Sequence, residues 1–280
     1  MTTADTTGRI DREDARRALA AGVAPRRWGS WYVAEHRLLA MKGYVGEAVF
    51  QSFGNPLIYL FALGVGLASL VPQGVAGVSY LEFVAPALMA TAAMTIAANE
   101  TTYPVLMGFK WNPTFFGMNA APITGGQIVG GIMLAILARM IMTVTIYFGV
   151  ILAFGAVPSP GGVLAIAAAV LTGMAIGLVL SSYTSTITDD RGQMAMIQRF
   201  GIMPLFLFSG TFFPLEQLPV YLQPIGWISP LWHGAELGRV ATYGLDEPLW
   251  LTVTHVGYLS GIILVGLWAT RRHFVRRLNR

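Results

Sequence analysis

The segment Pro204-Leu-Phe-Leu-Phe-Ser-Gly-Thr-Phe-Phe-Pro-Leu-Glu-Gln-Leu-Pro-Val-Tyr-Leu-Gln-Pro-Ile-Gly-Trp-Ile-Ser-Pro230 begins with enough apolar residues to enter a lipid bilayer, but prolines then interrupt it repeatedly. Five of the 15 prolines of the chain fall within it. Each internal proline removes a backbone donor and clashes with the preceding helical turn. Irregular backbone at membrane depth is tolerated only where protein or a water-filled cavity surrounds it. The segment is therefore expected to border a translocation path or to form its lid.

The composition of the whole chain is that of an integral membrane protein. Of the 280 residues, 55% are hydrophobic and only 11% are charged, whereas a soluble domain carries about 25% charged residues. Several long stretches contain no charge, and a helical span requires about 20 apolar residues. We therefore predict an all-α membrane protein with six transmembrane helices, at residues 48–71, 82–105, 123–154, 162–187, 198–213 and 248–270.

Lysine and arginine are distributed unevenly between the two sides of such a chain. Residues 1–47 contain eight, the loop 106–122 contains one, the loop 188–199 two and the tail 271–280 five, which makes 16 of the 18. Positively charged loops remain in the cytoplasm. Both termini are therefore expected in the cytoplasm, and the proline-rich segment on the outer face. The same topology explains the basic pI near 9.5 without a nucleic-acid partner.

The pattern of charged and aromatic residues divides the chain into four regions. Residues 1–24 are expected to form a polar cytoplasmic N-terminus, residues 48–270 the six-span domain, and residues 271–280 a basic cytoplasmic tail. Residues 25–47 predict an amphipathic helix in the inner interface, because aromatic and basic residues beside a span favour that position. The alternative is that this stretch is only the solvated start of the first span. The apolar face of the helix would carry Trp28, Trp31, Tyr32, Leu38 and Leu39.

Two ionisable residues fall inside predicted spans. Glu100 lies near the inner end of the second span, and Arg139 lies near the middle of the third. A charge at membrane depth is costly, so such a residue is expected to be paired or functional. At a rise of 1.5 Å per residue the two positions differ in depth by about 10 Å, which disfavours a direct ion pair. A structural role for Arg139 and a role facing the path or a partner subunit both remain open.

Glycine is abundant but predicts little about packing. Gly-xxx-Gly pairs allow membrane helices to approach closely. Four such pairs are about the number expected by chance from 32 glycines in 280 residues, so they carry little weight: Gly126/Gly130, Gly173/Gly177, Gly234/Gly238 and Gly257/Gly261.

The chain lacks the sequence signatures of an enzyme. Its two lysines, Lys42 and Lys110, are followed by Gly43 and Trp111, so neither belongs to a phosphate-binding Gly-Lys-Ser/Thr loop. We therefore expect no catalytic residue, no ATP site and no bound cofactor in this chain. Cysteine is absent, and no metal centre is expected, because the histidines are scattered and are more typical of packing or interfacial residues: His36, His233, His255 and His273.

Two stretches carry a shared pattern. The first reads Phe208-Ser-Gly-Thr-Phe-Phe-Pro-Leu-Glu-Gln-Leu-Pro219, then Ser229-Pro-Leu-Trp-His-Gly234 and Arg239. The second is residues 99–122, which contain Glu100 and Thr102-Tyr103 before a short amphipathic stretch ending at Pro122. Together they resemble the signature of ABC-2 type export permeases, especially the nodulation-factor (NodJ-like) and drug-resistance exporters. The resemblance extends from the first span to the tail.

The resemblance implies a six-span half-transporter in the bacterial cytoplasmic membrane. Such a permease pairs with a second permease, as a homodimer or a heterodimer, and with two cytoplasmic ATPase subunits that bind ATP and Mg²⁺. Family members export lipo-oligosaccharides, polysaccharide intermediates or hydrophobic drugs. The cavity would lie at the dimer interface, lined by the first, second and fifth spans, and membrane lipids would surround the complex.

The resemblance also assigns roles to residues. The loop at about 107–120 would dock on the ATPases, although Lys110 stands where the family usually has arginine, and Trp111-Asn112-Pro113 replaces a more polar stretch. The docking set is Glu100, Tyr103, Phe109, Lys110, Phe115, Phe116 and Pro122. Residues 213–232 would form two short re-entrant helices as an outer lid that either gates the substrate or only seals the dimer, with Phe212, Phe213 and Leu215 as candidate plugs. The lid set is Ser209, Gly210, Phe212, Phe213, Pro214, Leu218, Pro219, Pro230, His233 and Arg239.

Two other function classes remain as alternatives. A channel or secondary carrier without an ATPase would require intramembrane acidic residues, and the predicted spans offer almost none besides Glu100. A membrane-embedded transferase would require an acidic or histidine cluster, and the pair Asp189-Asp190 is more simply a solvated loop. An adjacent reading frame that encodes a phosphate-binding loop, or an ATPase that copurifies, would favour export.

Overall fold

The computed structural model describes residues 12–280 apart from 45, 47–49, 51–53, 55–56 and 68–72. The described residues are mostly helical and contain no strand beyond an isolated bridge between Val75 and Val78. Four of the described helical stretches are long and apolar enough to cross a membrane: Tyr80–Phe109, Gly125–Ala153, Pro160–Thr184 and Leu249–Leu278. The all-α membrane class is therefore confirmed, and these stretches coincide with four of the six predicted spans.

Capping residues determine where these helices begin. Ser79 and Glu82 form a capping box, in which each side chain accepts the backbone N–H of the other residue, and Thr124 and Gln127 form a second. Near Thr102 the first stretch is broken, because this residue has a non-helical backbone and Pro104 follows it. The elements are α4 (Tyr80–Thr101), α5 (Tyr103–Phe109), α6 (Thr114–Ala120), α7 (Gly125–Ala153), the 3₁₀ turn η4 (Pro160–Val163), α8 (Leu164–Thr184) and α13 (Leu249–Leu278).

The other two predicted spans are not seen as long helices. Of residues 48–71, 11 lie outside the described residues, and the described ones include the π-helix η2 (Leu60–Leu67). In place of the span predicted at 198–213, the structure has a helical run at 193–208 that consists of α9 (Gln193–Met196), the π-helix η5 (Ile197–Ile202) and α10 (Met203–Phe208). Its 16 residues extend about 24 Å, less than the bilayer core of about 30 Å. Pro204 accounts for the π-helical turn that precedes it. Gly210, whose backbone lies in the left-handed region, ends the helical run after Phe208.

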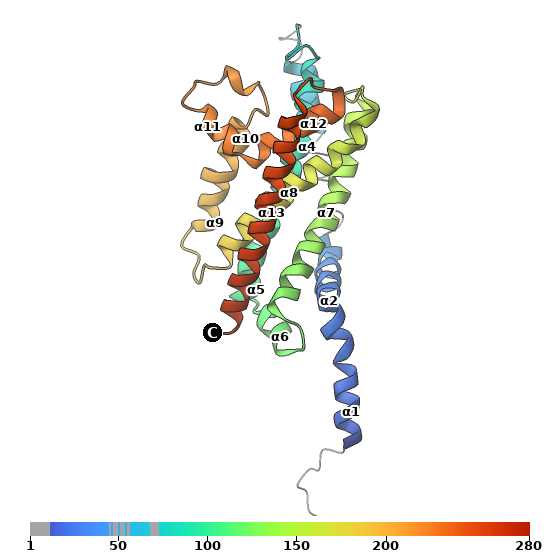
Figure 1. Cartoon of the computed structure of the whole chain (residues 1–280), viewed down its shortest axis with the longest axis vertical. Helices are drawn as coiled ribbons and strands as arrows, with labels where there is room; N and C mark the ends of the chain where they lie inside the picture. Colours follow the sequence, from blue (N-terminus) through green and yellow to red (C-terminus); the bar gives the residue numbers. More distant parts are fainter. Residues whose placement is uncertain (1–11, 45, 47–49, 51–53, 55–56, 68–72) are drawn as a thin grey trace, which may run out of the picture.

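The bundle is centred on α4, which lies against α7, α8 and α12 (Pro230–Tyr243) (Figure 1). Alanines on α4 and glycines on α8 allow the two helices to approach closely. A Cβ added at Gly173 would lie 2.8 Å from the Ala93 carbonyl oxygen, and one added at Gly177 would lie 3.1 Å from the Ala97 Cβ. α13 covers α8 from the outside and remains mostly exposed (Figure 1).

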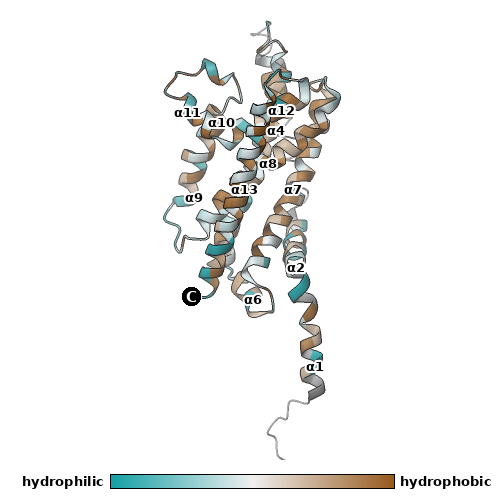
Figure 2. Cartoon of the chain, in the orientation of Figure 1, coloured by the Kyte–Doolittle hydropathy of each residue, from teal (hydrophilic) through white to brown (hydrophobic). Residues whose placement is uncertain are grey.

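The two ends of the bundle differ in character. One end, the α6 end, carries α5, α6 and the C-terminus; the other, the α12 end, carries α12 and α11 (Gln223–Ile228) (Figure 1). Hydrophilic residues gather towards the α6 end of α13 and at the lower end of α2 (Val23–Met41), whereas the bundle itself is mainly hydrophobic (Figure 2). Most of the predicted tail 271–280 belongs to α13, which continues to Leu278. Phe274 and Leu278 are buried, so this part of the helix packs against the bundle.

The proline-rich segment that follows α10 forms a loop and short helices. The expected pair of helices at 213–232 corresponds to the 3₁₀ turn η6 (Leu215–Gln217) and to α11. α12 then begins at Ser229, whose side chain accepts the Leu231 N–H, with Pro230 at its first position. This 14-residue helix was not among the elements predicted from the sequence.

The N-terminal region forms two helices instead of one. α1 (Arg12–Ala21) projects beyond the bundle, and α2 (Val23–Met41) crosses α7 before the 3₁₀ turn η1 (Lys42–Tyr44) (Figure 1). Glycines make the crossing close, since a Cβ at Gly131 would lie 2.5 Å from the Val33 Cβ. Trp28 and Trp31 remain exposed on α2.

Candidate functional site

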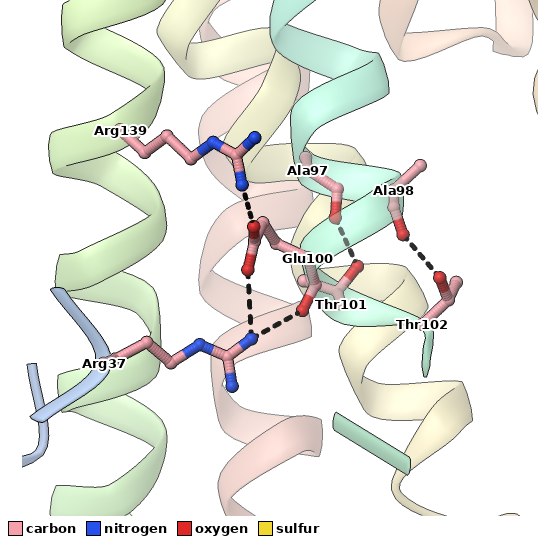
Figure 3. A network of polar contacts seen from close by, with 7 residues as sticks. All are labelled: Arg37, Ala97, Ala98, Glu100, Thr101, Thr102 and Arg139. Atoms are coloured by element: carbon pink, nitrogen blue, oxygen red, sulfur yellow. Dashed lines mark hydrogen bonds and ion pairs between the residues drawn. The ribbon is translucent and has the colours of Figure 1, made fainter. Parts of the chain in front are cut away.

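A cluster of three charged residues joins α2, α4 and α7 near the α6 end (Figure 3). Glu100 lies in the last turn of α4, and its side chain is only 7% exposed. One carboxylate oxygen accepts a hydrogen bond from Arg37 at 3.1 Å, and the other is paired with Arg139. Arg37 also donates to the Glu100 carbonyl oxygen at 3.1 Å. Glu100, expected in the docking set, is therefore held inside the fold.

The ion pair between Arg139 and Glu100 corrects the expectation that their depths would keep them apart. α4 is followed by α5, so the apolar stretch continues to Phe109 and Glu100 lies farther from its end than the predicted boundary at 105 implied. Arginine also carries its charge on a long side chain that can extend along a helix. In Figure 3 the Arg139 side chain reaches from α7 towards the end of α4.

A cavity of about 420 Å³ lies beside this cluster, within a single chain. α4, α7, η5 and α10 line it together with Tyr59. Polar residues recur every fourth position along one face of each long helix, a spacing that places them on the same side. They are Thr91, Thr95 and Asn99 on α4, and Arg139, Thr143 and Tyr147 on α7.

The polarity of the cavity changes along its length. α4 runs towards the α6 end and α7 runs away from it, so Asn99 and Arg139 lie nearer that end than Leu88 and Tyr147 do. Arg199 lies on the same side, one residue after Gln198, whose amide donates to Asn99 at 3.4 Å. The α12 end of the cavity includes Leu88, Phe206 and Tyr59, together with Tyr147.

The expected docking residues divide into buried and exposed groups. Phe109 and Phe115 are buried against Phe274, with ring centroids 4.7 and 5.4 Å away, and the Arg277 guanidinium lies 4.1 Å from the Phe109 ring. Their side chains therefore contribute to packing. The exposed members are Tyr103, Lys110, Phe116 and Pro122.

The exposed face at the α6 end includes Met107 and Trp111, which lie in the expected docking loop at about 107–120 but were not in the docking set. Trp111 is 56% exposed and stacks on Tyr103 with centroids 6.4 Å apart, and Met107 is exposed beside them. Lys110 pairs with Asp189 in the loop before α9. The hydrogen bond and positive charge of Lys110 lower the pKa of the Asp189 carboxyl.

At the α12 end, Arg239 connects three segments. Its guanidinium donates to the carbonyl oxygens of Phe83 at 3.3 Å and Gly210 at 2.6 Å, and to the Glu236 carboxylate at 2.7 Å. It also lies 3.7 Å from the centroid of the Phe83 ring. Ser209 donates to the Ser229 hydroxyl at 2.6 Å. The structure therefore brings Ser209, Gly210 and Arg239 of the expected lid together as a buried polar network.

The remaining lid residues surround this network. Phe212 contacts Phe206 with centroids 4.9 Å apart, and its carbonyl oxygen accepts a hydrogen bond from Tyr80 at 3.2 Å. Two leucines, Leu215 and Leu218, are buried and so belong to the packing of the loop. Half-buried residues are Phe213, Pro214 and Pro230, and Pro219 is exposed.

Two of the histidines that looked scattered are in contact. His233 Nδ1 lies 2.6 Å from His255 Nδ1, and His233 Nε2 lies 3.0 Å from the Trp227 carbonyl oxygen. His255 Nε2 lies 3.5 Å from a Glu247 carboxylate oxygen. No group of three or more metal-ligating side chains is arranged to hold a metal ion within the part of the chain that the structure describes. The pair therefore links α12 to α13 as packed side chains.

Comparison with known proteins bears out the resemblance. Residues 37–243 match the ABC-2 type transporter family. The chain is 31% identical over 243 residues to nodulation protein J of Rhizobium leguminosarum bv. viciae, covering 86% of this chain and 92% of that protein. It is 29% identical over 274 residues to nodulation protein J of Neorhizobium galegae, covering 97% and 99% of the two chains. Membrane subunits of this family are generally not ATPases, because a separate subunit hydrolyses ATP. The chain therefore belongs to the ABC-2 type transporter family, as a multi-pass membrane subunit of an ABC exporter.

Proposed function

We propose that this chain forms the permease of an exporter in the bacterial cytoplasmic membrane, with six spans and both termini in the cytoplasm. It would assemble with a second copy or a homologous permease and with two ATPase subunits, which hold ATP and Mg²⁺. The cargo would be an amphipathic or lipid-linked molecule, such as a lipo-oligosaccharide, a polysaccharide intermediate or a hydrophobic drug, moved outward from the cytoplasm or the inner leaflet. The cavity with its change from polar to apolar lining is the observation that favours this cargo.

The exposed aromatic face at the α6 end supports docking of the ATPases. Tyr103, Met107, Trp111 and Phe116 are all exposed there, on α5, α6 and the loop between them. Aromatic residues and methionine are enriched in protein interfaces, and tryptophan often contributes most of the binding energy. Burial of these exposed apolar side chains against a protein partner would be more favourable than their contact with water.

The Glu100 cluster suggests how movement of the docked face reaches the cavity. α5 follows α4 directly, and Glu100 lies just before the break at Thr102. Its carboxylate is tied to Arg37 of α2 and to Arg139 of α7, a residue that also lines the cavity. When ATP closes the ATPase dimer, displacement of α5 and α6 would therefore shift α4 and α7 together and alter the cavity between them.

The docking proposal is tested by changing Trp111→Ala. We expect the affinity for the ATPase subunit to fall about thirtyfold, since loss of a central interface tryptophan commonly costs about 2 kcal/mol. Copurification and permease-stimulated ATP hydrolysis measure the effect. Trp250→Ala is the matched control, because Trp250 is 67% exposed on α13 at the opposite end. Equal ATPase affinity in both variants would count against docking at this face.

A transport assay separates export from the ATPase-independent alternatives. Vesicles containing the permease and its ATPase are expected to move labelled glycolipid or hydrophobic drug only when ATP is hydrolysed. Movement at the same rate without the ATPase would favour a channel or secondary carrier. Chemical modification of the glycolipid without its movement would favour a membrane-embedded transferase.

A further inference from the structure

We propose that the cavity between α4, α7 and η5–α10 binds an anionic amphiphile. Its acidic head would lie at the α6 end between Arg139 and Arg199, and its apolar part would extend towards Leu88 and Phe206. The identification of this amphiphile as cargo rests on the proposed export function, whereas the existence of the site does not. The chemical class is a lipid phosphate or carboxylate.

The charge around the cavity favours an anion. Two arginines line it, and among the described residues its lining includes neither aspartate nor glutamate. Glu100 lies outside the lining, with its carboxylate already shared by Arg37 and Arg139. Arg199 is exposed and forms no ion pair within the described residues. Among the described residues at this end of the cavity, three arginines accompany one glutamate, and guanidinium groups bind phosphate and carboxylate in a bidentate manner.

Tyr147 provides an independent indication of a ligand. Its side chain is 2% exposed and lines the cavity, and its hydroxyl has no hydrogen-bond partner among the described residues. A buried polar group without a partner is costly, so such groups are normally satisfied. Tyr147 lies two helical turns beyond Arg139, about 12 Å along α7. A carbonyl or hydroxyl in the ligand, beyond its charged head, would satisfy it.

The size and opening of the cavity suit part of a lipid. A volume of about 420 Å³ is within the range of about 300–1,000 Å³ that is typical of small-molecule sites. Thr95, Asn99 and Arg199 are exposed at its α6 end, so the cavity reaches the surface there. A charged head could therefore remain near water while one acyl chain occupies the apolar part.

The test uses two ligands that differ only in the phosphate. The purified full-length permease, in nanodiscs of phosphatidylcholine, is titrated with palmitoyl lysophosphatidate or with monopalmitoylglycerol, and native mass spectrometry measures binding. We expect lysophosphatidate to bind at least about tenfold more tightly, because a charged hydrogen bond contributes about 1.5–3 kcal/mol. Equal affinity for the neutral ligand would overturn the proposal.

Substitutions then locate the site. Arg199→Gln is expected to weaken the binding of lysophosphatidate about tenfold. Tyr147→Phe is expected to weaken the binding of both ligands about threefold, as loss of a neutral hydrogen bond does. Arg276→Gln, which removes an exposed arginine on α13 away from the cavity, should leave binding unchanged. An unchanged melting temperature shows that each variant is folded. The site is wrong if Arg276→Gln weakens binding as much as Arg199→Gln does.

Two further experiments distinguish a transported ligand from a lipid that stays bound to the permease. In vesicles containing the permease and its ATPase, ATP-driven movement of labelled lysophosphatidate identifies a transported ligand. A phosphatidylglycerol molecule that stays bound through turnover identifies a resident lipid, and either result supports the site. If no ATPase binds and no movement occurs, the export function fails while the binding result stands. If export proceeds but Arg199→Gln and Arg276→Gln bind lysophosphatidate equally, the site alone fails.

Discussion

Glu100 illustrates how one carboxylate can hold three helices together. Its two oxygens are paired with Arg37 and Arg139, so its loss would leave two guanidinium groups in a largely buried position. Breaking a buried ion pair by removing one partner is strongly destabilising, since the remaining charge has no compensation. The cluster therefore contributes to the fold as well as to the proposed coupling.

Glu100→Ala is expected to lower the free energy of unfolding by about 3 kcal/mol or more, as removal of one partner of a buried pair typically does. Equilibrium unfolding in mixed micelles, followed by tryptophan fluorescence, measures this change. Glu216→Ala, at an exposed glutamate of the α12 end, is the matched control and should change stability little. Equal stability of the two variants would show that the cluster adds nothing to the fold.

Arg239 depends on the shape of its side chain as well as on its charge. Its guanidinium donates to two carbonyl oxygens and one carboxylate while it lies over Phe83. Lysine cannot reproduce this planar set of donors or the stacking. The Gly210 carbonyl oxygen would therefore lose its partner.

Arg239→Lys is expected to destabilise the protein by about 2 kcal/mol, the contribution of hydrogen bonds to a charged group. Limited proteolysis should also detect earlier cleavage in the loop at 209–222, because that loop is attached to Arg239 through Gly210. Arg271→Lys provides the comparison at an exposed position. Unchanged cleavage of the loop would argue against its attachment by Arg239.

At the scale of helices, the contact between α4 and α8 depends on the absence of side chains. An alanine Cβ at position 173 would lie 2.6 Å from the Met140 side chain and 2.8 Å from a backbone oxygen, whereas nothing lies within 4 Å of Gly257. Of the four Gly-xxx-Gly pairs, Gly173/Gly177 on α8 and Gly234/Gly238 on α12 therefore pack against neighbours, and Gly257/Gly261 does not.

Gly173→Ala is expected to destabilise the bundle by about 1–3 kcal/mol, the usual effect of overpacking. Gly177→Ala should have a smaller effect, because its nearest neighbour lies at 3.1 Å, and Gly257→Ala should have almost none. The order of the three unfolding free energies is the measurement. A loss at Gly257 equal to that at Gly173 would contradict close packing as the cause.

The sequence predicted helices well where length and apolarity suffice. Uncharged runs of 28, 49 and 23 residues indicated α7, α8 and α13, and a run of 17 residues between Glu82 and Glu100 indicated α4. The boundary of α13 was placed at Arg271, because charge alone does not show that Phe274 and Leu278 continue the buried face. α12 was missed because Pro230 looked like an interruption, although Ser229 before it is a typical N-cap and proline suits the first helical position.

The candidate site was only partly predictable, because contacts between distant helices are not encoded in local spacing. Arg139 and Glu100 were identified as unusual charges, but their pairing depends on where α5 extends the helix. The polar spacing of Thr91, Thr95 and Asn99 is visible in the sequence, yet the cavity it lines also requires η5 and α10. No local pattern distinguishes the buried Phe115 from the exposed Phe116.

At the scale of the whole molecule, the proposed lid and the proposed docking face lie at opposite ends of the bundle. Phe212 and Phe213 border a second cavity at the α12 end, with Tyr80 and Gln217. Their replacement should therefore affect exit of the cargo without affecting the ATPase.

The double change Phe212→Ala and Phe213→Ala is expected to reduce ATP-driven transport severalfold while ATPase affinity stays the same, because the α6 end is untouched. Transport in vesicles and copurification measure the two effects separately. Tyr221→Ala serves as the control, since Tyr221 is an exposed aromatic residue of the same loop. Unaltered transport in the double variant would count against a lid at these residues.

The mostly exposed helix α13 also indicates where the bilayer lies. Trp250 and Trp268 are both exposed on it, 18 positions apart in the sequence, which corresponds to about 27 Å along a helix. Arg272 lies over the Trp268 ring, 5.3 Å from its centroid. Tryptophans concentrate in two belts at the edges of the hydrocarbon layer, which is about 30 Å thick. The distance between Trp250 and Trp268 therefore sets the hydrophobic thickness that suits α13. In a much thinner or thicker bilayer, either the bilayer would deform or the helix would tilt until both tryptophans reached the interfaces.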